Sequence, residues 1–498
     1  MASREAKTLP KLQSAWVAAR NSPSGWPQFL EAVYVDGLRG WKQQWVEFRF
    51  PVVAIAGENG SGKSTILKAA ATAYGQAASG KDYTPDDFFP STPWEDVEGV
   101  RLAYRVRRGS DVATHTVRKP TSRWRGMPER PSREVLFLDV SRTQPIDSLI
   151  GYGKVARTEL AKSKDRLVLE DGYRLSLSRV MGRTYTEGSI VRDARGKQVG
   201  VVKHDGSVYS NFHQGTGEDT TTDLMAALQI APRHSLVLID EVEASLHPRA
   251  QRRLMTELID IATQRRLQLI VTTHSPYVLE QLPAEARIYL RMARGGGREP
   301  IYGVTADYAL SLMDDEAHPE LTLYCEDGTA SQMTEQIIRS EDPVLLERVQ
   351  IAPVGPAGTV RILGDLAGGD RLPEGGVGVL DGDQPPARGC IVLPGKPAAP
   401  ERAIFESLND DHYVTIAQRL GVDAGTLMDA TEDAMRLEDH HAWPARVAKK
   451  LGTMRTSRVL DAFLDVWVRD VLTHEEREVF VEHVRERLPA MEAPRTAE

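Results

Sequence analysis

Short apolar runs that end in polar or acidic residues recur along the chain and predict buried β-strands. The runs VVAIA at 52–56 and LVLI at 236–239 are continuous rather than alternating, which is typical of strands covered on both faces of a parallel sheet. A third run, LQLIVTT at 267–273, leads into a helix-like segment. Buried strands interleaved with helical patterns predict an α/β fold.

A glycine-rich phosphate-binding pattern, GENGSGKST at 57–65, directly follows the first run. Backbone N–H groups of such a loop, together with the N-terminus of the helix expected at 64–73, favour a bound phosphate. We expect Lys63 to reach the β- and γ-phosphates of a nucleotide and Ser64 to bind Mg²⁺. The predicted nucleotide-binding residues here are Asn59, Gly60, Ser61, Gly62, Lys63, Ser64 and Thr65.

Two acids close the second run, in the sequence LVLIDE at 236–241. We expect Asp240 to belong to the Mg²⁺ shell and Glu241 to polarise the attacking water. Together with the glycine-rich loop, this pair predicts a chain that binds and hydrolyses ATP.

Length and composition limit the number of domains and the kind of protein to which these motifs belong. A chain of 498 residues allows about three domains. No run approaches the length of a membrane-spanning helix and no signal-peptide pattern opens the chain, so we expect no membrane partner and a cytoplasmic location. With Cys325 and Cys390 as its only cysteines, the chain has no disulfide framework and no four-cysteine zinc site; a single disulfide is weakly favoured in a reducing compartment.

The net charge of −8 gives no global indication of nucleic-acid binding. One local stretch differs: residues 101–133 hold ten Lys or Arg residues, with Tyr104 and Trp124 among them. This stretch is either a solvated basic face or a surface for a nucleic acid or another partner.

The order of motifs resembles that of the ATP-binding-cassette (ABC) superfamily, in particular its soluble branch of chromosome-maintenance and DNA-repair ATPases and the OLD (overcoming lysogenization defect) family. In that family a signature loop, a D-loop and a switch histidine follow the phosphate loop. By resemblance, the D-loop is EASLHP at 243–248, His274 senses the γ-phosphate, and Gln144 is the Q-loop residue. The signature residues by resemblance are Gly215, Thr216, Gly217 and Glu218, although Gln214 and Gly215 replace the usual Leu-Ser.

This resemblance implies a homodimer or a higher homo-oligomer. In such ATPases the signature loop of one copy completes the phosphate loop of another, so that ATP joins the two copies. The prolines of residues 66–210 and strand-like pieces such as VRLAYRVRR favour a short inserted lobe, at about 80–210, over the long coiled coils of chromosome-maintenance proteins. We therefore expect an N-terminal extension at 1–27 and an ATPase domain at 28–305.

A second acidic constellation follows. LTLYCEDG at 321–328 and GVGVLDGDQ at 376–384 are apolar runs that end in acids. Neighbouring strand ends meet at the carboxyl edge of a parallel sheet, so Glu326, Asp381 and Asp383 are predicted to converge. Their oxygens suit Mg²⁺ or Mn²⁺, which activates water and stabilises a phosphodiester leaving group.

This spacing resembles the TOPRIM domain of topoisomerases, primases and OLD-family nucleases, here expected at 318–400. OLD nucleases often carry a further acid four residues after the glutamate, where this chain has Ala330. The segment IVLPGKPAAPE at 391–401 offers Lys396 to a scissile phosphate and Glu401 to a metal ion; the alternative for Lys396 is an ordinary surface lysine in a Pro/Gly loop. The alternative is a TOPRIM-like fold kept for structure, with ordinary acidic loop ends.

Residues 401–498 are predicted to be helical, because apolar residues recur at three- and four-residue spacing in SRVLDAFLDVWVRDVL at 457–472. Thr473 and Glu476 form the pattern of a capping box that opens another helix.

Two functions remain open from the sequence. In the first, an ABC-type ATPase of a bacterial anti-phage defence system, similar to OLD-like and Gabija proteins, gates a TOPRIM nuclease acting on DNA or another nucleic acid. In the second, similar to Septu and PARIS ATPases, an ATPase sensor with an inert TOPRIM-like domain holds and releases a separate effector protein.

Overall fold

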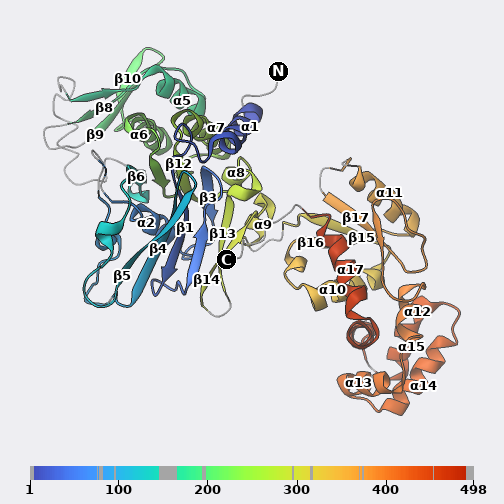
Figure 1. The fold of residues 1–498 in the computed structure, drawn as a ribbon. Helices are drawn as coiled ribbons and strands as arrows, with labels where there is room; N and C mark the ends of the chain where they lie inside the picture. Colours follow the sequence, from blue (N-terminus) through green and yellow to red (C-terminus); the bar gives the residue numbers. More distant parts are fainter. Residues whose placement is uncertain are drawn as a thin grey trace. The chain divides into compact units, whose positions relative to one another are not determined.

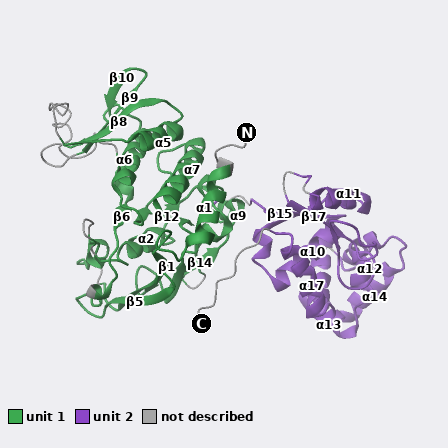
Figure 2. Ribbon diagram, turned by 45° about the horizontal axis from the view of Figure 1, so that its top comes forward, with its two compact units in different colours: residues 1–313, 491–498 green, residues 314–490 purple. Residues whose placement is uncertain are grey.

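The computed structural model of the chain divides into two compact units, one ending at Met313 and the other comprising Asp314–Ala490 (Figure 2). Each unit has its own hydrophobic core. The structure describes residues 5–75, 77, 82–94, 97–144, 165–192, 198–293, 296–314, 318–369, 371–372, 375–452 and 454–488.

A six-stranded sheet forms the centre of the first unit, in the order β14-β13-β3-β12-β11-β6 (Figure 1). All neighbours are parallel except the edge pair β13–β14. Every residue of β3, β11 and β12 is buried, as their continuous apolar runs predict. The strands are β3 Val52–Ala56, β6 Val135–Leu138, β11 Leu236–Ile239, β12 Gln268–Thr273, β13 Arg287–Met292 and β14 Arg298–Tyr302.

A second, antiparallel sheet has the order β2-β1-β4-β5. Helix α2 (Lys63–Ala71) contacts β1 of this sheet as well as β11 and β12 of the central one, so it lies between the two sheets. The buried Gln268 amide also joins them, because its Nε2 donates to Leu30 O (2.7 Å) and its Oε1 accepts from Leu30 N (2.9 Å). The strands are β1 Gln28–Asp36, β2 Gln44–Glu47, β4 Val100–Arg108 and β5 Asp111–Lys119.

A third, antiparallel sheet with the order β10-β9-β8-β7 lies beside helices α5 and α6 (Figure 1). Between α2 and α6, the longest helix in the described residues is α5, with 11 residues, so the described part of this region contains no long coiled coil. The elements are β7 Arg166–Val168, α5 Asp171–Met181, β8 Tyr185–Arg192, β9 Gln198–His204, β10 Ser207–Ser210 and α6 Thr216–Ile230.

The predicted N-terminal extension belongs to the first unit. Helix α1 (Glu5–Ala19) packs on α7 (Pro248–Arg265) and buries Leu12 and Trp16. Shorter elements complete this unit: α3 Pro85–Phe88, η1 Met127–Glu129, η2 Val140–Thr143, α8 Pro276–Leu279, η5 Ala284–Ala286 and α9 Ala306–Ser311.

The second unit contains a four-stranded parallel sheet with the order β16-β15-β17-β18. The faces of β17 differ: Val377 and Val379 belong to the hydrophobic core, whereas Gly376 and Gly378 lie on the face covered by helix α11. On that face a Cβ would lie 2.6 Å from the Tyr324 ring at Gly376 and 2.6 Å from Cys390 Sγ at Gly378. The elements are β15 Leu321–Cys325, α10 Gly328–Glu341, η6 Leu345–Glu347, β16 Val349–Pro353, α11 Ala357–Gly368, β17 Gly375–Leu380 and β18 Cys390–Val392.

Helices follow the sheet, as predicted, and the capping box of Thr473 and Glu476 is confirmed. These helices share one core with the sheet, so the expected regions 318–400 and 401–498 form a single unit. Among the described helices, none has the length and apolar character needed to cross a membrane. They are α12 Pro400–Phe405, α13 Asp410–Leu420, α14 Ala424–Met435, η7 His440–Ala442, α15 Trp443–Lys450, α16 Thr456–Val466, η8 Trp467–Val471 and α17 His474–Arg485.

Candidate functional site: a nucleotide pocket and an acidic cluster

The glycine-rich loop connects β3 to α2 and depends on glycine at particular positions. Gly60 and Gly62 have φ angles of 78° and 97°, in the left-handed region that other residues rarely adopt. At Gly62 a Cβ would also lie 2.6 Å from the indole nitrogen of Trp41. The loop therefore passes over Trp41 and presents the N-terminus of α2, where phosphate binding is favoured.

Lys63 lies folded into this loop. Its Nζ donates to the carbonyl oxygens of Gly57 (2.8 Å) and Glu58 (2.9 Å). Burial lowers the Lys63 pKa to about 8, against the opposing effect of Asp240 and nearby glutamates. Two buried polar atoms close by, Ser61 Oγ and Trp41 Nε1, have no hydrogen-bond partner among the described residues. The pocket thus contains polar groups that a phosphate would satisfy.

Strand β12 lies between β3 and β11, and this order brings the two nucleotide motifs together. Ser64 Oγ donates to Asp240 Oδ1 over 3.2 Å, and Thr272 Oγ1 at the end of β12 donates to the same oxygen over 2.5 Å. A buried carboxylate beside two hydroxyls is a set of hard oxygen donors that fits Mg²⁺.

Glu241 follows Asp240 in a left-handed conformation, with φ of 49°. Its N–H donates to Thr272 Oγ1 (2.8 Å), and its carbonyl oxygen accepts from the Arg142 guanidinium (2.8 Å). These bonds hold a backbone conformation that is costly for glutamate, as is common at functional sites.

Thr272 and Arg142 were not singled out in the sequence. Thr272 could have been found, because it precedes His274 at the end of a predicted strand. Arg142 lies two positions before Gln144, the residue expected in the Q-loop. The Gln144 side chain is exposed. In the structure it is therefore Arg142 that reaches the acidic motif from this segment.

His274 is anchored at the end of β12, since its N–H donates to Glu243 Oε1 over 2.6 Å. Burial and the nearby charge of Lys63 lower the His274 pKa, so the imidazole is neutral at neutral pH. A neutral ring next to Lys63 can donate a hydrogen bond to a phosphate without adding charge.

The expected signature residues lie at the start of α6. Gly215 is the N-cap residue, and a Cβ on Gly217 would lie 2.4 Å from Ser245 O in the expected D-loop. Glu218 is turned inward: its Oε1 accepts from Tyr185 (2.5 Å) and Tyr209 (2.7 Å). The Glu218 carboxylate therefore has a packing role, which leaves residues 215–217 to present the helix terminus.

In the second unit, the acids that follow β15 and β17 converge as predicted. Cys325 pairs with Val379, which places Glu326 beside the start of the Asp-Gly-Asp turn. Glu326 Oε1 accepts from Asp381 N (3.4 Å) and Oε2 from Ala357 N (2.9 Å).

Asp381 is 7% exposed, and its Oδ1 makes no hydrogen bond within the described residues. Burial, together with the charges of Glu326, Asp327 and Asp383, raises its pKa to about 8. Asp383 is exposed at the same edge. Clustered carboxylates with an unsatisfied buried oxygen fit a divalent cation, which would relieve their mutual repulsion.

Lys396 does not place its ammonium on this cluster. Its Nζ donates to Glu406 O over 3.1 Å, while its backbone carbonyl would lie 2.8 Å from a Cβ on Gly382. Gly382 is thus needed between the two aspartates because the 396–398 segment packs closely against it.

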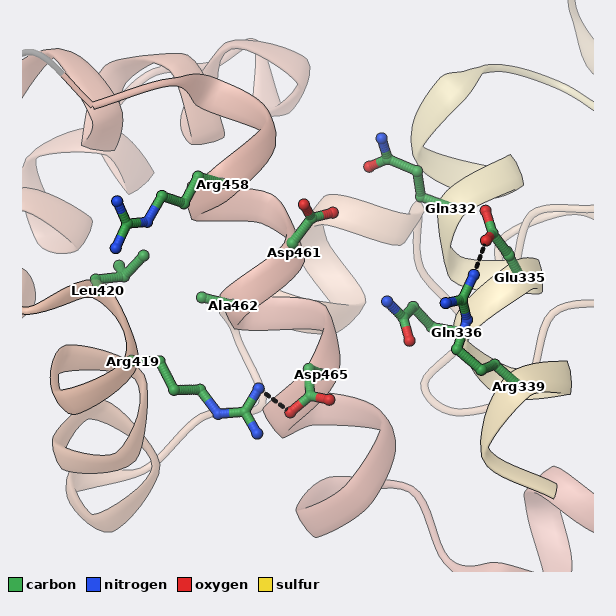
Figure 3. A pocket seen from close by; sticks show the side chains of 10 residues that line it. All are labelled: Gln332, Glu335, Gln336, Arg339, Arg419, Leu420, Arg458, Asp461, Ala462 and Asp465. Atoms are coloured by element: carbon green, nitrogen blue, oxygen red, sulfur yellow. Dashed lines mark hydrogen bonds and ion pairs between the residues drawn. The ribbon is translucent and has the colours of Figure 1, made fainter. Parts of the chain in front are cut away.

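A polar cleft of about 500 Å³ lies between α10, α13 and α16 (Figure 3). Arg339 forms an ion pair with Glu335, and Arg419 with Asp465. Because these charges largely neutralise one another, we assign no chemistry to this cleft.

Two family models match parts of the first unit. Residues 146–280 match the family described as "AAA domain, putative AbiEii toxin, Type IV TA system", and residues 32–122 match an "AAA domain". A search of curated proteins finds no match to the chain.

Several solved structures are similar. The Smc head bound to the C-winged helix domain of ScpA is 18% identical, with TM-score 0.38, covering 57% of this chain and 99% of that chain. The SMC head domain from Thermotoga maritima is 16% identical, with TM-score 0.31, and the match covers 55% of this chain and 98% of that chain. The Pyrococcus furiosus Smc head domain with an extended coiled coil is 15% identical, with TM-score 0.36, and the match covers 57% of this chain and 98% of that chain.

The phosphate loop, the acidic strand end beside it and the two family models define a P-loop ATPase domain of the AAA/ABC type. ATP is its nucleotide and Mg²⁺ its usual metal ion, which fits the oxygen donors of Ser64, Asp240 and Thr272.

ATP binding is expected to weaken as pH rises above about 8. The free Lys63 loses its proton near that pH because the pocket is buried, whereas bound phosphates favour the charged form. Binding must then take up a proton, so the affinity falls by up to about tenfold per pH unit above 8 and stays flat below it. Calorimetric titrations in buffers of different ionisation enthalpy measure this uptake; binding without proton uptake at alkaline pH would contradict the expectation.

Proposed function

We propose that this protein is an ATP-controlled, metal-dependent nuclease of a bacterial defence system. The proposal depends chiefly on Asp381, a buried carboxylate with an unsatisfied oxygen that lies between Glu326 and Asp383 at the carboxyl edge of a parallel sheet. Ligands of open α/β sheets bind at this edge. The divalent cation that these acids would hold, Mg²⁺ or Mn²⁺, activates water and stabilises the phosphodiester leaving group when bound.

In the first unit, each group has a distinct role in ATP hydrolysis. Lys63 would leave the Gly57 and Glu58 carbonyls to bind the β- and γ-phosphates, and Ser64 and Asp240 would hold the Mg²⁺. Glu241 accepts the proton of the attacking water, and neutral His274 donates to the γ-phosphate.

A second copy of the chain would complete this site. The start of α6, at residues 215–217, offers N–H groups that have no partner within the helix, and the positive end of a 15-residue helix. We infer that it caps the ATP bound to the partner, so that hydrolysis separates the pair.

A nucleic acid is the proposed partner. Arg101, Arg118 and Arg125 line a cavity of about 510 Å³ on the β4–β5 face, together with Glu129. Three guanidiniums at one opening suit the phosphates of a nucleic-acid backbone. The defence role is supported by the family description of residues 146–280, which names an AbiEii toxin and a type IV toxin–antitoxin system.

The test is cleavage of plasmid and linear DNA by the purified chain with Mg²⁺ or Mn²⁺, with and without ATP. Wild-type cleavage is expected to be lost in the Asp381→Asn/Asp383→Asn double variant, because the cation loses its ligands. Asp429→Asn, an exposed aspartate on α14, is the matched control and should retain full activity.

The alternative function is an ATPase sensor whose second unit is inert and which releases a separate effector. The position of Lys396 favours it, because the ammonium lies on Glu406 O and leaves the acids without that cationic partner. Intact ATP hydrolysis without cleavage under any of these conditions would reject the nuclease and support the sensor.

A further inference from the structure

A carboxylate and two imidazoles meet in the second unit, near the acidic cluster of Glu326, Asp381 and Asp383. The carboxylate is that of Glu401, for which the sequence predicted an approach to a metal ion. Glu401 comes from α12, and His440 and His441 come from the turn η7, which is far from it in sequence. One potential ligand atom from each residue lies within 4.8 Å of the others. His440 Nδ1 is 3.3 Å from Glu401 Oε2, and His441 Nδ1 is 3.3 Å from Glu401 Oε1.

We propose that Glu401, His440 and His441 form a binding site for a divalent transition-metal ion of the zinc class. Metal–ligand bonds of about 2.0–2.1 Å in a tetrahedral site separate the ligand atoms by about 3.4 Å. The 3.3 Å between His440 Nδ1 and Glu401 Oε2 matches this separation, and one ligand atom from each of the three residues lies within 4.8 Å of the others.

The Glu401 carboxylate is the strongest sign of a ligand. Its side chain is 1% exposed, yet its Oε2 accepts no hydrogen bond within the described residues. His440 Nδ1, which faces this oxygen, forms no hydrogen bond there either. A buried carboxylate oxygen is costly without a partner. A metal ion bound between the two atoms would satisfy both.

Neighbouring groups are placed to orient the ligands. Thr329 Oγ1 donates to Glu401 Oε1 over 2.8 Å, and Asp327 Oδ2 lies 3.7 Å from His441 Nδ1. A hydrogen bond such as the one from Thr329 fixes the orientation of a metal ligand. Asp327, at 3.7 Å from His441 Nδ1, makes no hydrogen bond there and offers a further oxygen near the ion.

The donor set separates this site from the acidic cluster. Glu326, Asp381 and Asp383 offer only hard oxygens, which suit Mg²⁺ and Mn²⁺, whereas imidazole favours zinc-class ions. Asp327 directly follows Glu326 in sequence and lies near His441, so the two sites adjoin each other. Zinc binding by the histidines is nevertheless independent of the nuclease proposal.

The described residues contain one other group that could hold a metal ion, with two carboxylates and one imidazole: Glu341, His474 and Glu478. There Arg477 already binds Glu341 over 2.5 Å and His474 is exposed, so the group is an ion-pair network at the surface. It provides a matched control.

The experiment is calorimetric titration of the full chain, stripped with a chelator, with Zn²⁺ and separately with Mg²⁺. We expect one zinc ion to bind at this site, and its affinity to fall at least tenfold in His441→Ala and in Glu401→Gln, with no loss in His474→Ala. The Asp381→Asn/Asp383→Asn variant should keep zinc binding even if DNA cleavage is lost, which separates this proposal from the nuclease.

His441→Ala is the safer variant because its side chain is 57% exposed, so the fold does not depend on it. Thermal unfolding with and without Zn²⁺ gives a second readout: the ion should raise the Tm of the wild type and of His474→Ala but not that of His441→Ala. Absence of zinc binding by the wild type, or zinc binding and stabilisation that persist in His441→Ala, would overturn the proposal.

Discussion

Replacement of Glu241 by glutamine is expected to leave ATP binding intact and to slow hydrolysis by about 10²–10⁴-fold. Glutamine keeps the size of the side chain but cannot accept the proton of the attacking water. The backbone is held by Thr272 and Arg142, so the substitution leaves the surrounding geometry in place. Steady-state release of phosphate and equilibrium binding of ATP measure the two effects separately.

A matched control is Glu280→Gln, which removes an exposed carboxylate that pairs with Arg252 on the surface. Its turnover should equal that of the wild type. If Glu241→Gln hydrolysed ATP at an unchanged rate, the assignment of Glu241 would have to be abandoned.

Replacement of Lys63 by alanine is expected to weaken ATP binding by about 100-fold, and hydrolysis would be lost with it. The ammonium is the one cation of the glycine-rich loop, and charge-assisted hydrogen bonds to phosphate are each worth about 1.5–3 kcal/mol. Lys68→Ala is the control, because Lys68 lies near the end of the same helix, away from the loop. Equal affinities in the two variants would exclude Lys63 from phosphate binding.

The meeting of distant acids could be predicted from sequence for a simple geometric reason. Residues that follow buried parallel strands lie at one edge of the sheet, so Asp240 reaches Ser64, and Glu326 reaches Asp381, whatever the rest of the chain does. To predict these meetings, it is enough to know which strands are neighbours in the sheet. The continuous apolar runs indicated where the strands are.

The contacts of Glu218 and Lys396 could not be predicted, because each depends on distant or irregular segments. Tyr185 and Tyr209, which bind Glu218, belong to strands of a separate antiparallel sheet. Lys396 turns to a carbonyl at the end of α12, which no side-chain pattern encodes. The same limit applies to the cluster of Glu401 with His440 and His441, since packing of the helices brings η7 to α12.

The close approach of Gly217 to Ser245 O has a mechanical consequence. Ser245 lies four residues after Glu241 and has a left-handed φ of 64°, so the turn between them is tightly constrained. With no side chain to act as a spacer, α6 rests directly on that turn. We therefore expect a movement of Glu241 to be transmitted to the start of α6 through this backbone contact.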